Sequence, residues 1–171
     1  MGQFIALLRG INVGGNNRLP MADLRRLCED LGWRNVRTYI ASGNVVFEAD
    51  GGAEALASAL HAALPFDAQV LVMGEDDFRT RMTHCPFPPS HGKLAHGFFC
   101  LDRPTLDADV IAQFRTTEVV IQEDHTVWLH TPDGFSKSKL AEVMDRVITE
   151  TAFTARNLNT VHKLAEMLDK G

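Results

Sequence analysis

Hydrophobic residues in the first half of the chain follow two different spacings. Apolar positions three or four residues apart predict helices at 21–31, stopped by Gly32, and at 56–64, stopped by Pro65. Short apolar or β-branched runs predict four strands, at residues 3–8, 36–40, 45–47 and 69–73. The order βαββαβ is that of a ferredoxin-like (split βαβ) unit, and a short helix at 75–82 follows it.

The second half repeats this order after a break. Residues 83–93 carry three prolines and no periodicity, which predicts a linker. Beyond it, strands are predicted at 95–101, 119–122 and 127–130, and helices at 106–114 and 140–148. Thr154 is predicted to cap a last helix, and any final strand is expected to be short and near residues 152–153. Arg156 and Asn157 then fall in the first turn of that helix.

We therefore predict an α+β protein of two ferredoxin-like halves with an extra C-terminal helix. The first half covers residues 1–82, the linker 83–93, and the second half with the helix 94–171. The two halves share the order of their elements and not their residues, so the repeat is inferred from order alone.

Composition bears on which partners the protein binds and on the cellular compartment in which it works. The net charge of −5 argues against a protein that grips nucleic acid phosphates, and the first half lacks the interleaved aromatics of an RNA-binding plait. No apolar run approaches the roughly 20 residues that cross a bilayer, and the N-terminus does not resemble a signal peptide. Three scattered cysteines are typical of free thiols in a reducing cytoplasm.

Topology predicts which loops of the first half meet. In a split βαβ unit the sheet order is 4-1-3-2 and neighbouring strands are antiparallel. The loop after the first strand, 9–19, and the hairpin at 42–44 then lie at the same end of the sheet. Because strands one and three are adjacent, we expect these two polar, glycine-containing loops to touch.

These two loops form the predicted binding region for a small anionic or phosphorylated ligand. No acidic residue occurs from Met1 to Ala22, glycine-rich backbone can form amide nests that bind anions, and arginine suits phosphate and carboxylate. The residues concerned are Arg9, Asn12, Gly14, Gly15, Asn16, Arg18, Ser42 and Asn44. In the alternative interpretation, the glycines and asparagines only shape a long connection, and Arg9 pairs with a carboxylate of the second half.

Familiar catalytic and cofactor motifs are not found. The first loop lacks the Gly-Lys-Ser/Thr ending of a P-loop and the glycine spacing of a dinucleotide fold. The histidines and the cysteine between residues 84 and 96 match no zinc spacing, and no cysteine is paired with a base by any motif. We therefore expect no metal and no cofactor.

Several motifs together resemble the bacterial domain of unknown function 1697 family. The matching stretches are Leu7-Leu8-Arg9-Gly10-Ile11-Asn12-Val13-Gly14-Gly15, Tyr39 with Ser42-Gly43-Asn44-Val45-Val46-Phe47, Lys137-Ser138-Lys139-Leu140, and Thr154-Ala155-Arg156-Asn157-Leu158-Asn159-Thr160-Val161. The family pattern has tryptophan where this chain has Leu158. The resemblance implies two plait-like halves and no particular reaction.

The same resemblance implies a second set of polar positions, which are Lys137, Lys139, Arg156 and Asn157. Residues 151–165 contain no acid, so we treat this region as a second part of the ligand-binding set. One hypothesis joins the two regions, with Arg156, Lys137 or Lys139 facing the Arg9 loop across a cleft. In the alternative, the two lysines are a solvated helix start.

Two classes of function stay open on the sequence alone. The first is a cytoplasmic protein that binds a small anionic ligand at the first loop; if it is an enzyme, its catalysis is electrostatic. The second is a non-enzymatic interaction or homodimerisation module. The first strand favours the second class, because it is apolar on both faces and a plait covers only one face with helices.

Overall fold

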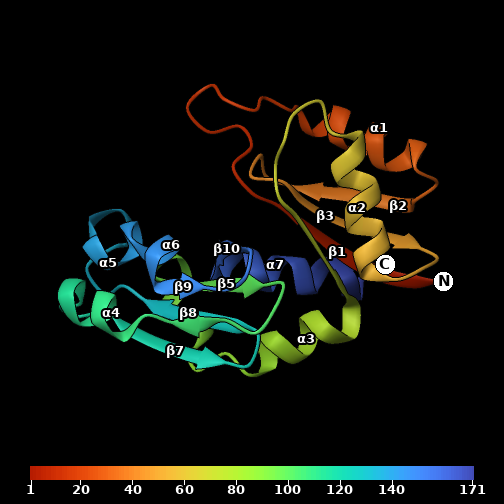
Figure 1. Cartoon of the computed structure of the whole chain (residues 1–171). Coiled ribbons are helices and arrows are strands. Elements are labelled where there is room, and N and C mark those ends of the chain that lie inside the picture. The colour runs from red at the N-terminus through yellow and green to blue at the C-terminus, as the bar shows by residue number, and fades with distance from the viewer. The chain divides into compact units, whose positions relative to one another are not determined.

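The computed structural model describes all residues from 1 to 171 and divides them into two compact units. The first unit contains residues 1–80 and 163–171, and the second contains residues 81–162. Each is built on a four-stranded antiparallel sheet (Figure 1). The segment 83–93 predicted as a linker belongs to the second unit, where residues Pro89–Leu94 form the 3-10 helix η1.

The first unit has the predicted order of elements. Its strands are β1 (Gly2–Leu8), β2 (Arg34–Tyr39), β3 (Asn44–Ala49) and β4 (Val70–Gly74), arranged as β2-β3-β1-β4. Its helices are α1 (Met21–Asp30), α2 (Ala53–Ala63) and most of α3 (Glu75–Thr83). This is the 4-1-3-2 sheet of a ferredoxin-like unit, so the fold prediction is confirmed for this half.

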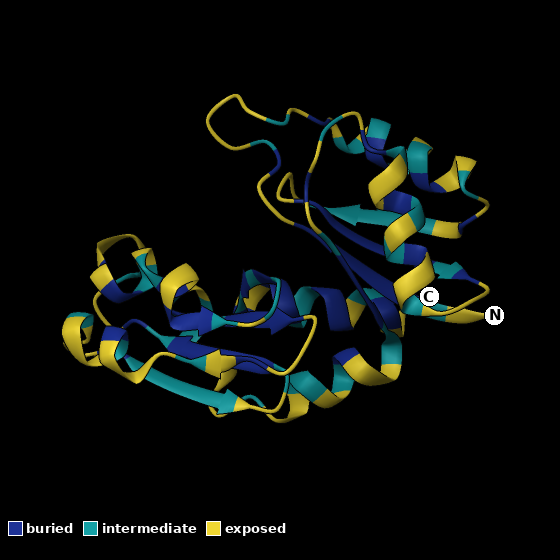
Figure 2. Cartoon of the chain, viewed as in Figure 1, coloured by how far each residue is buried: buried dark blue, intermediate teal, exposed yellow.

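Both faces of the first sheet are buried. Phe47 stacks on Trp33 with ring centroids 3.8 Å apart, in the core that α1 and α2 share with one face of the sheet. On the other face Ile5 and Leu7 are also fully buried, and most of β1 is drawn in the dark blue of buried residues in Figure 2. The end of α7 (Leu158–Asp169) reaches this face, because the Gln3 amide donates to the Leu168 carbonyl at 3.2 Å.

The second unit repeats the plait. Its sheet has the order β10-β5-β8-β7, formed by β5 (Ala95–Cys100), β7 (Val119–Glu123), β8 (Thr126–His130) and β10 (Phe153–Asn157). One face is covered by α4 (Ala108–Phe114), η2 (Phe135–Lys137), α5 (Lys139–Glu142) and α6 (Met144–Val147). A two-stranded ribbon, β6 (Thr105–Leu106) with β9 (Ile148–Thr149), completes it. None of the helices combines the length and apolar character needed to cross a bilayer.

Three element boundaries differ from the sequence prediction. Arg156 and Asn157 are not helical: they end the strand β10, and α7 begins at Leu158, where the Asn157 side chain caps the Thr160 amide at 2.9 Å. Thr154 is a buried strand residue and not the cap. The helix predicted at 140–148 is split at Val143 into α5 and α6, and the helix predicted from 106 begins at Ala108, capped by Asp107.

Candidate functional site

The first loop and the β2–β3 hairpin touch, as the topology predicts. The Leu8 amide donates to the Gly43 carbonyl at 2.9 Å, and the Asn12 side-chain amide donates to the Ala41 carbonyl at 2.8 Å. Ile11 is buried beneath this contact. The two segments therefore form one end of the first unit.

The exposed part of the first loop is a small β-hairpin. Asn12 and Asn17 pair through a backbone hydrogen bond of 3.1 Å, and the Asn16 amide donates to the Val13 carbonyl at 2.9 Å. Gly14 and Gly15 have φ of +56° and +79°, the positive pair that a type I′ turn requires. The two glycines therefore serve the turn of this hairpin.

Three of the predicted ligand residues hold the loops in shape. Asn12 has a φ of +55°; its side chain donates to Leu19 and Ala41 carbonyls and accepts from the Leu19 amide at 2.7 Å. Asn44 is fully buried and donates to the Tyr39 carbonyl at 2.8 Å and to the Ser42 hydroxyl at 3.0 Å. These hydrogen bonds directly support the alternative interpretation for Asn12, Ser42 and Asn44, in which the residues shape the loops and bind no ligand.

Replacing Asn12 with alanine is expected to lower the free energy of unfolding by about 2 kcal/mol. The variant loses three side-chain hydrogen bonds, each worth about 1 kcal/mol, partly regained through water. Asn12→Gly keeps the positive φ accessible and loses the same bonds, so its cost isolates the hydrogen bonds. Urea unfolding of both variants measures this; wild-type stability in Asn12→Gly would contradict the role given to the side chain.

The remaining predicted residues of this region are exposed. Arg9, Gly14, Gly15, Asn16 and Arg18 all lie on the surface, and the side chains of Asn16 and Arg18 make no hydrogen bond or ion pair. Asp67, in the segment that precedes β4, pairs with His61, with 2.8 Å between Oδ1 and Nε2. Asn16 in the hairpin and Arg18 directly after it thus present a free amide and a free guanidinium at this end of the unit.

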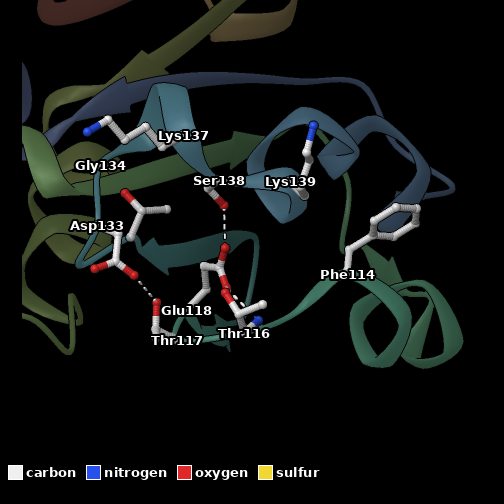
Figure 3. A pocket seen from close by; sticks show the side chains of 10 residues that line it. Phe114, Thr116, Thr117, Glu118, Asp133, Gly134, Lys137, Ser138 and Lys139 are labelled. Atoms are coloured by element: carbon white, nitrogen blue, oxygen red, sulfur yellow. Dashed lines mark hydrogen bonds between the residues drawn. The ribbon is translucent and has the colours of Figure 1, made fainter.

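Lys137 and Lys139 belong to a different place, a pocket of about 160 Å³ within the second unit. Three segments line it: 114–118 between α4 and β7, 131–134 after β8, and 137–139 at the start of α5. Figure 3 shows the two lysines on either side of Ser138. Both are exposed and neither makes an ion pair.

A buried carboxylate, Glu118, fixes the floor of this pocket. It accepts hydrogen bonds from the Ser138 hydroxyl at 2.5 Å and from the amide and hydroxyl of Thr116 at 2.8 and 3.1 Å. Burial alone would raise the pKa of Glu118, but these hydrogen bonds outweigh it and lower the pKa to about 2. Ser138 in turn caps α5 by accepting from the Ala141 amide at 3.0 Å.

Arg156 and Asn157 do not line this pocket. Arg156 is a buried residue of β10, its guanidinium donates to the Thr154 hydroxyl at 2.9 Å, and desolvation lowers its pKa to about 10. Asn157 is used as the cap of α7. Arg156 and the two lysines belong to the second unit and the Arg9 loop to the first, so the hypothesis that they face one another across a cleft stays a prediction.

The histidines do not gather into a metal centre. No group of three or more His, Cys, Asp or Glu side chains is placed to hold an ion. His96 stacks on Phe135 with centroids 3.8 Å apart, and burial lowers its pKa to about 4. His91 and His130 pack ring to ring at 4.1 Å.

Glu118, Thr116 and Asp133 line the pocket but are not among the residues predicted from the sequence. Each is separated from Lys137 and Lys139 along the chain, and only the fold brings them together. One local signal was present: a lone carboxylate, Glu118, stands directly before an apolar strand. Such a residue is seldom buried without a hydrogen-bonding partner.

The fold defines a class, the α+β proteins built from two ferredoxin-like halves, and the comparisons with known proteins give the family. The sequence matches the family described as "Protein of unknown function (DUF1697)" over residues 1–130, and the chain belongs to this family. Among solved structures it is similar to the conserved bacterial protein SP0830 from Streptococcus pneumoniae. The two share 28% identity, with 98% of each chain covered and a TM-score of 0.74. No curated protein matches the chain.

Proposed function

We propose that this protein binds a small anionic ligand at the exposed end of the first unit, on the hairpin of residues 12–17 and its flanks. The observation that carries the proposal is Arg18: its guanidinium is exposed and unpaired, in a stretch of 22 residues without an acid. A guanidinium is always charged and offers five donors, which suits carboxylate or phosphate.

The rigidity of the hairpin supports the proposal. Because the side chains of Asn12 and Asn17 bond to loop carbonyls, the donors beside them are held in place before a ligand arrives. A preorganised surface loses less entropy on binding than a flexible loop does. Arg9 and Asn16 add two further exposed polar groups to this surface. The three free cysteines support a reducing, cytoplasmic location for this activity.

The test is a thermal-shift screen of the full chain against phosphate, nucleotides, sugar phosphates and small carboxylates. A ligand at one hundred times its Kd is expected to stabilise the protein by about 2.7 kcal/mol. Arg18→Ala is expected to weaken binding about ten-fold, since one charge-assisted hydrogen bond contributes about 1.5 kcal/mol or more.

Arg34→Ala is the matched control for this experiment. It removes the same charge from the same unit, at the opposite end of the sheet, where Arg34 forms only an exposed pair with Asp50 at 3.7 Å. Binding in this variant is expected to equal that of the wild type. Equal losses in both variants, or no stabilising anion in the panel, would argue against the site.

A protein-interaction role is the second candidate. Val13 and Ile40 are 63% and 50% exposed, and the hydrogen bond from Asn12 to Ala41 joins their neighbouring residues. Ile40 also has a φ of +49°, a strained conformation for a β-branched residue. Light scattering distinguishes the two roles, because a homodimer through this end would dissociate in a Val13→Asp variant.

A further inference from the structure

The strand β7 (Val119–Glu123) forms an open edge of the second sheet, in which the order of strands is β10-β5-β8-β7 (Figure 1). Its first three residues, Val119, Val120 and Ile121, are β-branched, apolar and only half-buried. Natural edge strands are usually protected against further pairing by lysine, proline or a bulge. The strand β7 contains none of these, and its five pairs with β8 follow one unbroken register. It therefore offers an apolar edge to which another strand can pair.

The strand β2 (Arg34–Tyr39), an edge of the first sheet, is protected in the usual way. Its register with β3 shifts between Arg34 and Arg37, and both of these residues are cationic. An interrupted ladder and like charges both oppose the addition of a further strand. The absence of such devices is thus a particular feature of β7 and not a general property of the edges in this chain.

The backbone groups that β7 points outward follow from the hydrogen bonds of β8. The Thr131 amide, directly after β8, donates to the Leu94 carbonyl before β5 at 2.8 Å, so the odd-numbered residues of β8 bond to β5. Its even-numbered residues then bond to the odd-numbered residues of β7. The amides and carbonyls of Val120 and Gln122 consequently point to the open edge. These four backbone groups make no other hydrogen bond within the protein.

The open edge of β7 is complementary to itself about a twofold axis at Ile121. In an antiparallel pair of two β7 strands centred there, Val120 of each copy lies opposite Gln122 of the other, and the two pairs together form four backbone hydrogen bonds. The two Ile121 side chains face each other in a non-hydrogen-bonded pair, the position at which side chains are closest. Glu123 lies opposite Val119, so no like charges are opposed.

We propose that two copies of this chain associate through β7, with the two strands paired antiparallel so that their sheets become one continuous sheet. A twofold contact uses the β7 edge of both copies, so assembly through it closes at the dimer. Because the pairing strand has only five residues, the contact is small and the dimer forms in a concentration-dependent way. The proposal concerns the second unit and does not rest on the anion-binding region or on the contact considered for Val13 and Ile40.

Light scattering of the full chain over a range of protein concentrations tests the proposal, together with hydrogen exchange of the backbone amides. The mass is expected to rise from one chain to two with concentration. The amides of Val120 and Gln122 are expected to exchange slowly in the dimer and rapidly in the dilute monomer, because only the pairing removes them from water. A chain that stays monomeric at every concentration would overturn the proposal. A dimer in which these two amides exchange rapidly would also overturn it, since the contact would then lie on another surface.

Val120→Pro removes one outward amide from each copy and keeps an apolar side chain. Proline is tolerated on an edge strand where its nitrogen faces solvent, so the monomer is expected to fold, which circular dichroism checks. The dimer Kd is expected to rise at least ten-fold, because two of the four hydrogen bonds between the strands are lost. An unchanged Kd in this variant would contradict the pairing.

Ile121→Lys is a second variant, which leaves every backbone group of β7 in place. It sets two ammonium groups against each other at the twofold axis and is expected to leave only monomer. Thr38→Lys is the matched control, because it adds the same charge to β2, the edge strand of the other sheet, and should leave the dimer intact. Val13→Asp, which tests the contact at the first loop, should not dissociate this dimer. Equal dissociation in the two lysine variants would argue against β7 as the interface.

Discussion

Replacing Gly43 with alanine is expected to lower the free energy of unfolding by about 3 kcal/mol. Gly43 has a φ of +91°, which costs an alanine about 1–2 kcal/mol. An added Cβ would also lie 2.8 Å from Ile11 Cδ1 and 2.9 Å from Leu8 Cβ. The Ile11 methyl group can move aside, but Leu8 Cβ is attached to a backbone that its amide holds against the Gly43 carbonyl at 2.9 Å. The clash therefore adds an overpacking cost of about 1–3 kcal/mol.

Gly15→Ala is the matched control, because Gly15 also has a positive φ, +79°, and a Cβ there would meet nothing within 4 Å. It should show the backbone cost alone, about 1–2 kcal/mol. Urea unfolding followed by circular dichroism measures both variants. Equal costs at the two glycines would mean that the close approach of the hairpin to the first strand does not constrain residue 43.

The contact at Gly43 is an example of a structural feature that the sequence alone predicts. Adjacent strands in a 4-1-3-2 sheet require the first loop and the hairpin to meet, and the structure contains that contact. The residue types do not reveal that Gly14 and Gly15 form a hairpin turn, or that the side chains of Asn12 and Asn44 donate to loop carbonyls. The turn and the bonds of Asn44 depend on local backbone angles that the residue types leave open, and the bond from Asn12 to Ala41 joins residues 29 apart in the chain.

The end of the chain shows a different reason for a wrong prediction. Residues Phe153–Asn157 were assigned partly to a helix because Thr154 stands before a helical stripe and resembles a cap. Pairing with β5 places them in a strand instead, in register from Phe153 opposite Cys100 to Asn157 opposite His96. A tertiary contact of more than 50 residues in sequence separation overrides the local signal here.

The pocket in the second unit could not be assembled from the sequence for the same reason. Lys137 and Lys139 were singled out by resemblance, but their neighbours come from the segments 114–118 and 131–134. A serine directly before a helix is typical of an N-cap, and the Ser138 hydroxyl does cap α5. Its second role, as the donor to Glu118, appears only when the start of β7 lies beside α5.

The network at Glu118 predicts a specific pH dependence of stability. Glu118→Gln is expected to be about 3 kcal/mol less stable than the wild type at pH 7. The native pKa of Glu118, about 2, lies below its ordinary value of 4.5, and each unit of difference corresponds to about 1.4 kcal/mol. A carboxylate with a lowered native pKa contributes its full stability above pH 4.5 and loses it as the pH falls toward 2. The difference between wild type and variant should therefore shrink between pH 5 and pH 2.

Urea unfolding of both proteins at pH 7, 5 and 3 measures this difference, which is expected to be about 1.4 kcal/mol at pH 3. Glu123→Gln removes an exposed carboxylate from the other end of β7 and should change stability little at any of these pH values. A gap between wild type and Glu118→Gln that stays constant from pH 7 to pH 3 would show that the carboxylate charge is not what stabilises the pocket floor. The replacement of one carboxylate oxygen by an amide nitrogen, rather than the missing charge, would then explain the loss.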